Sequence, residues 1–170
     1  MNRDFGLLLA RSAFGLAFAA HGAQKAFGSF GGPGLKAAAG SMESLGFKPG
    51  ARYAALTAYA EIVSGLLITL GLGAPAGPAT VIGVMTVAAR VAHAKNGFFA
   101  QAGGIEINVL YGAAALAFAM GGYGRYSLDA ALGIDEALAN DAFAWVAVAA
   151  GAAGAVFALS RREAPPAAEG

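Results

Sequence analysis

Apolar residues are gathered in five long runs along the chain, separated by polar and glycine-rich stretches. The runs occupy residues 5–28, 53–72, 77–94, 105–122 and 142–159. Each is close to the about 20 residues that a helix needs to cross the hydrocarbon core of a bilayer. An open sheet cannot span lipid, because its edges leave backbone groups without partners. The pattern therefore predicts an all-α transmembrane helix bundle, with four helices in the core and a fifth at the C-terminal end.

The composition supports a membrane protein. The 170 residues are 58% hydrophobic and only 12% charged, whereas about 25% of the residues of a typical soluble domain are charged. So few charges cannot form a polar shell around a soluble core, and we expect the lipid bilayer to surround the chain. The absence of cysteine excludes disulfides and thiolate metal sites. A net charge of +1 gives no reason to expect nucleic-acid binding.

The runs and connections predict three parts. Residues 1–133 hold the four-helix membrane domain, 134–160 an acidic connection with the fifth transmembrane helix, and 161–170 a disordered tail. The stretch "FGSFGGPGLK", residues 27–36, predicts a flexible turn or a short re-entrant loop after the first helix. Gly and Pro in residues 73–76 predict a tight turn, so that the second and third helices are antiparallel.

Loop charges predict the orientation. The connection after the first helix holds three basic residues and one acidic residue, whereas the connection after the fourth holds one basic residue and four acidic ones. An excess of Lys and Arg marks the cytoplasmic side. With five spans, this places the N-terminus outside and the C-terminus inside.

Ionisable residues converge on one side of the predicted bundle. The end of the first helix, the start of the second, the end of the third and the start of the fourth must share one leaflet, whichever way the protein faces. The residues that this collects are His21, Lys25, Arg52, Arg90, His93, Lys95 and Glu106.

Glu61 lies in the middle of the apolar run "TAYAEIVSGLLITLG". A carboxylate there costs about 2.5 to 3.5 kcal/mol on insertion scales, and intramembrane ionisable residues are usually functional. At 1.5 Å per residue, Glu61 lies about 13 Å inward from Arg52, and His21 lies at a similar depth. Arg11 reaches the middle from the opposite face. We therefore expect a polar pocket inside the bundle, built on Glu61 with His21 and Arg11 as candidate partners.

Other ionisable residues near this pocket carry alternatives. Lys25 is one turn from His21, and Arg90 is one turn from His93. Arg90 could instead extend to the interface, and Glu106 could simply stabilise the start of its helix. An ion pair that only fixes the helix register is the structural alternative for Glu61. The candidates for ligand binding or proton relay are Glu61, His21, Lys25, Arg11, Arg90, His93 and Glu106; no catalytic residue and no metal-ligand set is identified.

Five short pieces of the chain together carry a resemblance to a known family. They are "HGAQKAFGSFGGPG" (21–34), "ESLGFKPG" (43–50), "AEIVSGLLITLG" (60–71), "HAKNGFF" (93–99) and "GRYSLD" (124–129). On these pieces the chain resembles the DoxX family of small bacterial membrane proteins, over about residues 5–133 and in the family's order. The characteristic family positions are His21, Lys25, Glu61, His93, Gly97, Glu106, Arg125 and Asp129. The fifth apolar run lies beyond the usual four-helix unit.

The resemblance implies a location in the bacterial cytoplasmic membrane and a link to redox metabolism. The family takes its name from a subunit linked to thiosulfate:quinone oxidoreduction, and some members associate with superoxide-detoxifying and sulfur-metabolising proteins. The leading hypothesis is a redox-linked subunit that holds a quinone in the pocket, with no covalently bound cofactor and with redox enzymes as partners. Whether the chain is itself an enzyme stays open.

The rival hypothesis is a non-catalytic membrane scaffold or assembly partner whose buried charges are structural. Ala147, Gly151 and Ala155 repeat at a spacing that suits association with another helix, in a homo- or hetero-oligomer.

Overall fold

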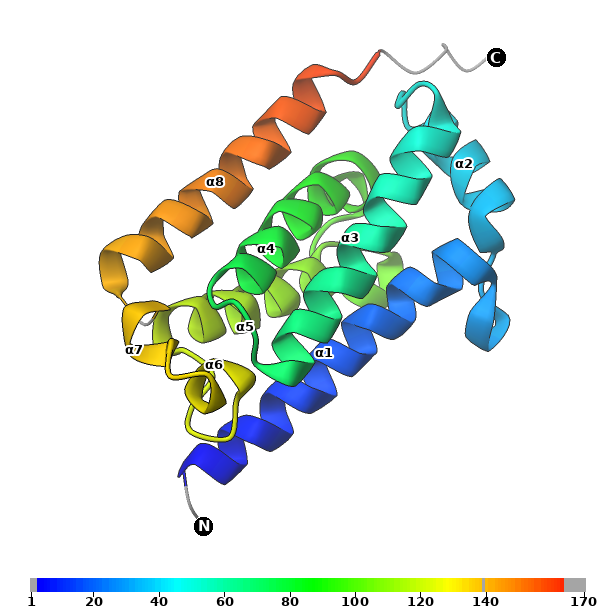
Figure 1. The fold of residues 1–170 in the computed structure, drawn as a ribbon. Helices are drawn as coiled ribbons and strands as arrows, with labels where there is room; N and C mark the ends of the chain where they lie inside the picture. Colours follow the sequence, from blue (N-terminus) through cyan, green and yellow to red (C-terminus); the bar gives the residue numbers. More distant parts are fainter. Residues whose placement is uncertain (1–2, 139, 164–170) are drawn as a thin grey trace, which may run out of the picture.

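Five long helices follow the five apolar runs of the sequence (Figure 1). The structure is a computed structural model that describes residues 3–138 and 140–163, and these residues contain helices and turns but no strand. The helices are α1 (Arg3–Phe27), α3 (Gly50–Leu70), α4 (Ala76–Ala88), α5 (Glu106–Gly121) and α8 (Asp141–Ser160). Of these, α1, α3 and α8 are long and apolar enough to cross a membrane, and α5 is a shorter apolar helix. The all-α prediction is confirmed.

The third run is helical to its predicted end, but its geometry changes on the way. After Ala88, α4 continues as a π-helical turn, Ala89–His93, which a 3₁₀ turn follows over Ala94–Asn96. A π-turn inserted in a helix shifts the side chains that follow it around the helix axis, and such turns are frequent at functional sites. The π-turn here carries Arg90 and His93, two of the predicted site residues.

Helix α2 (Gly34–Ser44) was not predicted, and it begins inside residues 27–36, where the sequence predicted a turn or a short re-entrant loop. Only a 3₁₀ turn, Ser29–Gly31, lies there, and α2 begins directly after Pro33. Proline suits the start of a helix because its φ is already helical and it has no N–H to satisfy. The sequence "GLKAAAGSMES" has no apolar run, which is why the pattern did not predict it. Figure 1 shows α2 beside the upper end of α3, which it contacts.

Helices α1 and α3 are antiparallel and pack most closely of all (Figure 1). A Cβ atom on Gly15 would lie 2.4 Å from the carbonyl oxygen of Gly65, and one on Gly22 would lie 2.5 Å from that of Ala58. Such small residues let helix backbones approach closely in a bilayer, where packing replaces the hydrophobic driving force. The close approach brings side chains on the last turns of α1 within reach of the middle of α3.

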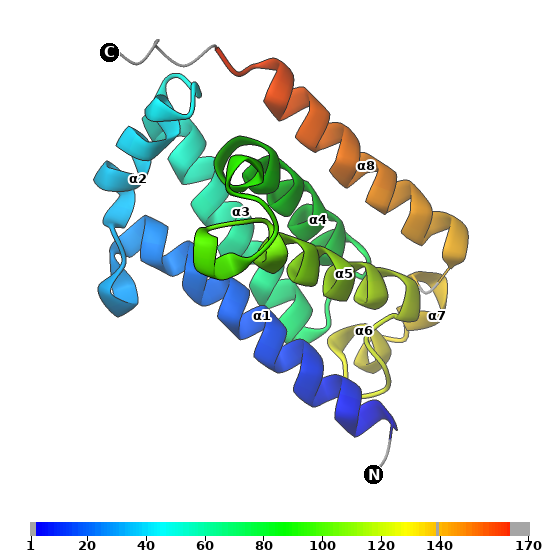
Figure 2. The same cartoon turned by 180° about the vertical axis from the view of Figure 1, so that it is seen from behind.

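An aromatic cluster joins α1 to α5, two helices that Figure 2 shows from behind. The ring of Phe14 lies 5.1 Å from that of Tyr111 and 5.4 Å from that of Phe118. Phe18 lies 5.4 Å from Tyr111. These rings belong to one apolar core that also includes Ile68 and Val81. The core therefore fills the space between α1, α3, α4 and α5.

Helix α8 lies along α4, on the side away from α1 (Figures 1 and 2). A Cβ atom on Gly151 would lie 2.2 Å from the carbonyl oxygen of Ala79, and Ala155 is buried. The rival hypothesis assigned these small residues to contact with a partner. Gly151 and Ala155 instead pack within the chain. The other face of α8 is apolar and exposed at Trp145 and Phe157.

The last described residues join the end of α8 to the connection between α2 and α3. Backbone N–H of Glu163 donates to the carbonyl of Gly46 at 2.8 Å, and Nε of Arg162 donates to that of Leu45 at 2.6 Å. Glu163 and Lys48 form an ion pair at 3.0 Å. The prediction of a disordered tail therefore needs correction at residues 161–163, while residues 164–170 lie outside the described part.

The start of α1 and the end of α8 lie at opposite ends of the bundle (Figure 1). This arrangement is what five alternating helices require. It also places the ends of α1 and α4 at the same end of the molecule as the start of α3, as the sequence predicted.

Candidate functional site

A buried ion pair links α1 to α3 in the middle of the bundle. Nζ of Lys25 lies 2.5 Å from Oε1 of Glu61. The Glu61 side chain is 0% exposed and that of Lys25 is 23% exposed. Both residues were predicted for the site, but the predicted partners of Glu61 were His21 and Arg11. The close contact of α1 with α3 explains why Lys25 reaches the carboxylate instead.

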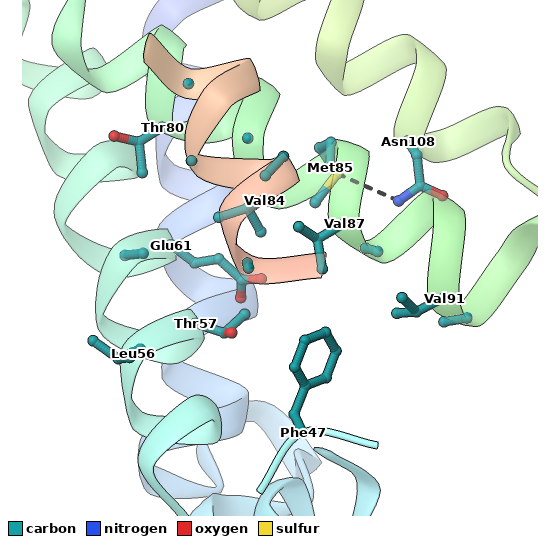
Figure 3. A pocket seen from close by; sticks show the side chains of 18 of the residues that line it. Phe47, Leu56, Thr57, Glu61, Thr80, Val84, Met85, Val87, Val91 and Asn108 are labelled. Carbon is teal, nitrogen blue, oxygen red and sulfur yellow. Dashed lines mark hydrogen bonds between the residues drawn. The ribbon is translucent and has the colours of Figure 1, made fainter. Parts of the chain in front are cut away.

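The second carboxylate oxygen of Glu61 takes no part in this ion pair. Oε2 is buried and receives no hydrogen bond from any residue that the structure describes. Buried polar atoms are almost always hydrogen-bonded, and leaving one unsatisfied costs about 1 to 3 kcal/mol, more for a charged group. Figure 3 shows the carboxylate pointing into a cavity. The orientation presents an unused hydrogen-bond acceptor to whatever occupies that space.

The cavity has a volume of about 570 Å³ and is mostly apolar. Helices α1, α3 and α4 surround the carboxylate, and the ring of Phe47 closes one end of the cavity (Figure 3). Another wall is formed by four residues of α8, Gly151, Gly154, Ala155 and Ala158. Binding sites for small molecules are typically apolar cavities of this size with a few polar groups that orient the ligand. The polar groups here are His21, Lys25, Thr57, Glu61, Thr80, His93 and Asn108.

The two histidines line this cavity from different helices. His21, on α1, is close enough to Lys25 and Glu61 to interact electrostatically with both, and the residue is exposed. The Nδ1 atom of His93 lies 2.8 Å from the carbonyl oxygen of Gly103. A ring nitrogen beside a carbonyl acts as the donor, and in a neutral ring this leaves Nε2 as an acceptor. His21, Lys25, Glu61 and His93 thus line one cavity.

Arg11 is not a partner of Glu61, which corrects the prediction. Its side chain is buried at the other end of α3, where the guanidinium donates to the backbone carbonyls of Ile68, Thr69 and Tyr126. The last carbonyls of a helix have no partner within the helix. Arg11 therefore stabilises the end of α3. Its position along the first helix predicts a depth near the middle of the membrane but does not fix the direction in which the side chain turns.

Arg90 and Glu106 also lie away from the cavity lining. Arg90 is exposed on the π-helical turn. Oε2 of Glu106, the first residue of α5, accepts a hydrogen bond from the N–H of Ala100 at 2.8 Å. Of the two interpretations of Glu106 that the sequence left open, the geometry supports a structural one, since the carboxylate fixes the loop that precedes α5.

Asn108 belongs to the site but was missed. It is buried on α5, and its Nδ2 donates to the sulfur of Met85 at 3.6 Å (Figure 3). Its amide inside the apolar run 105–122 was the available signal, because a polar side chain at membrane depth needs a partner or a polar cavity.

A second polar cluster lies at the other end of the bundle and is structural. The carboxylate of Asp129 accepts hydrogen bonds from the N–H groups of Gly73 and Ala74, at 2.8 and 3.0 Å, and so fixes the turn between α3 and α4. Burial and the neighbouring Asp129 carboxylate raise the pKa of the Tyr123 phenol, which therefore stays neutral. Among the residues that the structure describes, no group of three or more His, Asp or Glu side chains could hold a metal ion.

Comparison with known proteins identifies a family. A family model described as DoxX matches residues 6–94, just over half of the chain. The matched segment includes Lys25 and Glu61 and ends just after His93, while α5 and α8 lie beyond it. No curated protein and no solved structure matches the chain.

Proposed function

Because this chain belongs to the DoxX family and is a multi-pass membrane protein, we propose that it is a redox-linked membrane subunit that binds a quinone in the cavity beside Glu61. The observation that carries the proposal is the buried carboxylate of Glu61, which points into a cavity of about 570 Å³ (Figure 3) and whose Oε2 has no hydrogen-bond partner among the described residues.

The chemistry of the lining suits a quinone head group. The apolar walls match its ring, and its two oxygen atoms require hydrogen-bond partners. A quinol hydroxyl donates to Oε2 of Glu61, while a quinone oxygen accepts from Nζ of Lys25. Hydrogen bonds to charged groups contribute about 1.5 to 3 kcal/mol each. The pair therefore offers an acceptor and a donor at one end of the cavity.

Protons must leave when a quinol is oxidised and return when a quinone is reduced. Glu61 is fully buried, whereas His21 is exposed and lies near it at the edge of the cavity. Histidine changes its charge near neutral pH, so it is suited to pass protons between a buried carboxylate and water. In this proposal Glu61 holds the proton at the ligand, and His21 relays it.

The electrons are supplied or accepted by a partner redox enzyme. The chain has no cysteine for a dithiol or an iron–sulfur cluster. We place the protein in the bacterial cytoplasmic membrane with its C-terminus inside. The cavity then opens near the cytoplasmic end of the bundle, because it is lined by the connection between α2 and α3 and by the end of the α4 run.

The test compares Glu61→Gln with the matched control Glu106→Gln, which changes a carboxylate outside the cavity. Each protein is purified in a mild detergent, bound quinones are identified by mass spectrometry, and a tail-less benzoquinone is titrated. We expect Glu61→Gln to weaken binding about tenfold or more and Glu106→Gln to bind like the natural chain. Equal binding by the natural chain and Glu61→Gln would refute the proposal.

A scaffold function is the second candidate, and the Lys25–Glu61 ion pair favours it because it joins α1 to α3 directly. Under this alternative, Glu61→Gln lowers the thermal stability in detergent, and no quinone is found with the natural chain. Binding and stability thus separate the two functions.

A further inference from the structure

A second cavity lies on the outer side of α3, against α4. It has a volume of about 610 Å³, and its lining is more apolar than that of the Glu61 cavity. Along α3 the lining reaches from Arg52 to Leu67, which corresponds to about 22 Å of helix. We call this space the α3–α4 groove.

The groove adjoins the cavity that holds Glu61. Leu56 and Ala60 of α3 and Thr80 of α4 line both spaces. The residue next to Ala60 is Glu61, whose carboxylate points into the first cavity (Figure 3). A molecule that hydrogen-bonds to Glu61 can therefore extend past these three residues into the groove.

The groove opens where the bilayer surrounds the helix. Tyr59 and Val63, which line it, are among the exposed large apolar side chains. Such side chains on a membrane-spanning helix contact lipid tails. The groove is therefore accessible to a molecule dissolved in the membrane, and its apolar lining matches a hydrocarbon chain.

We infer that the ligand of the Glu61 cavity carries a hydrocarbon tail, and that this tail leaves between α3 and α4 and lies in the α3–α4 groove. The inference rests on the proposed function, since it assigns the groove to the tail of the molecule whose head group occupies the Glu61 cavity. The ligand class is a long-chain amphiphile with a compact hydrogen-bonding head. The protein then selects its ligand by the tail as well as by the head.

The direct test maps the tail. A benzoquinone with a decyl chain that ends in a photoreactive diazirine is added to the natural chain in lipid nanodiscs, and the labelled peptides are identified by mass spectrometry. We expect labels on residues 55–67 of α3 and 76–80 of α4, and we expect excess tail-less benzoquinone to remove them. Labels spread over all lipid-facing helices, or labels that the tail-less compound does not displace, would overturn the inference.

A groove variant provides an independent test. Val63→Trp fills the groove without touching the Glu61 cavity. Val146→Trp on α8 is the matched control, because both valines are more than half exposed and Val146 lines neither space. Val63→Trp should weaken binding of the decyl compound about tenfold and leave binding of the tail-less compound unchanged. Val146→Trp should change neither.

The outcomes separate the two proposals. If the tail-less compound binds in a manner that depends on Glu61 but Val63→Trp has no effect on the decyl compound, the tail site is wrong and the quinone site stands. If neither compound binds the natural chain, the proposed function fails and the tail inference fails with it.

Discussion

Replacing Lys25 with Met tests whether the Lys25–Glu61 pair offsets the burial of a carboxylate. Methionine keeps much of the length and apolar character of the lysine stem but removes the ammonium group. In the natural chain this group lies 2.5 Å from Oε1 of Glu61. After the substitution, both oxygens of a side chain that is 0% exposed lack a partner.

The magnitude follows from the burial of the two partners. Removing one member of a fully buried ion pair costs about 3 to 5 kcal/mol, because it leaves an uncompensated charge. Lys25 is 23% exposed, so water can replace part of its interaction and we expect a loss of about 2 to 3 kcal/mol. The double variant Lys25→Met/Glu61→Gln removes the charge as well, and it should recover most of this loss.

The assay is unfolding of the four proteins of this double-mutant cycle in one detergent, followed by circular dichroism. For a chain of this size, 1 kcal/mol corresponds to about 2 to 4 °C in Tm. We expect Lys25→Met to be the least stable of the four. The reasoning is refuted if the double variant is no more stable than Lys25→Met, since the carboxylate would then not be the source of the loss.

Other substitutions test the remaining features of the fold and site. Arg11→Met should lower the free energy of unfolding by about 3 kcal/mol, because three backbone carbonyls lose a charged donor. Quinone binding by the folded fraction should be unchanged, and a weakened affinity would place Arg11 at the site after all. Asp129→Ala should cost about 3 kcal/mol in the same unfolding assay, because two N–H groups lose their acceptor, and a neutral result would contradict its role in the turn. Gly65→Ala should lower the free energy of unfolding by about 1 to 3 kcal/mol despite the better helix propensity of alanine, because its Cβ would lie 2.5 Å from a backbone oxygen of α1. Normal stability of this variant would show that the two helices are not in such close contact. Gly154→Phe should abolish quinone binding and leave Tm unchanged, because residue 154 lines the cavity and a Cβ atom there meets nothing within 4 Å. The control Gly112→Phe, at a position equally open but outside the cavity, should bind quinone normally.

Periodicity and length were enough to predict the long helices, because a chain in lipid must satisfy its backbone within each segment. Glu61 could be identified for the same reason, since a charge in an apolar run is costly. Helix α2 could not be predicted in this way. It lies at the end of the bundle, where residues such as Lys36 are tolerated and no apolar run is needed.

The partners of the charges were harder to predict than their depth. Rise per residue placed Glu61 and Arg11 within reach of each other, but rotation about each helix decides where a side chain points. Gly15 and Gly65 set the contact between α1 and α3, and this contact directs Lys25 to Glu61 and Arg11 to the end of α3. Recognising these glycines as a contact surface would have required knowing which helices are neighbours.

The central claim is that the free oxygen of Glu61 bonds to a ligand in the cavity. Infrared difference spectroscopy of the natural chain and of Glu61→Gln, recorded before and after addition of a benzoquinone with a decyl tail, observes that carboxyl group directly. We expect a carboxyl band that shifts when the quinone binds and that is missing in the variant. A quinone that binds the natural chain and leaves every carboxyl band in place would contradict the account.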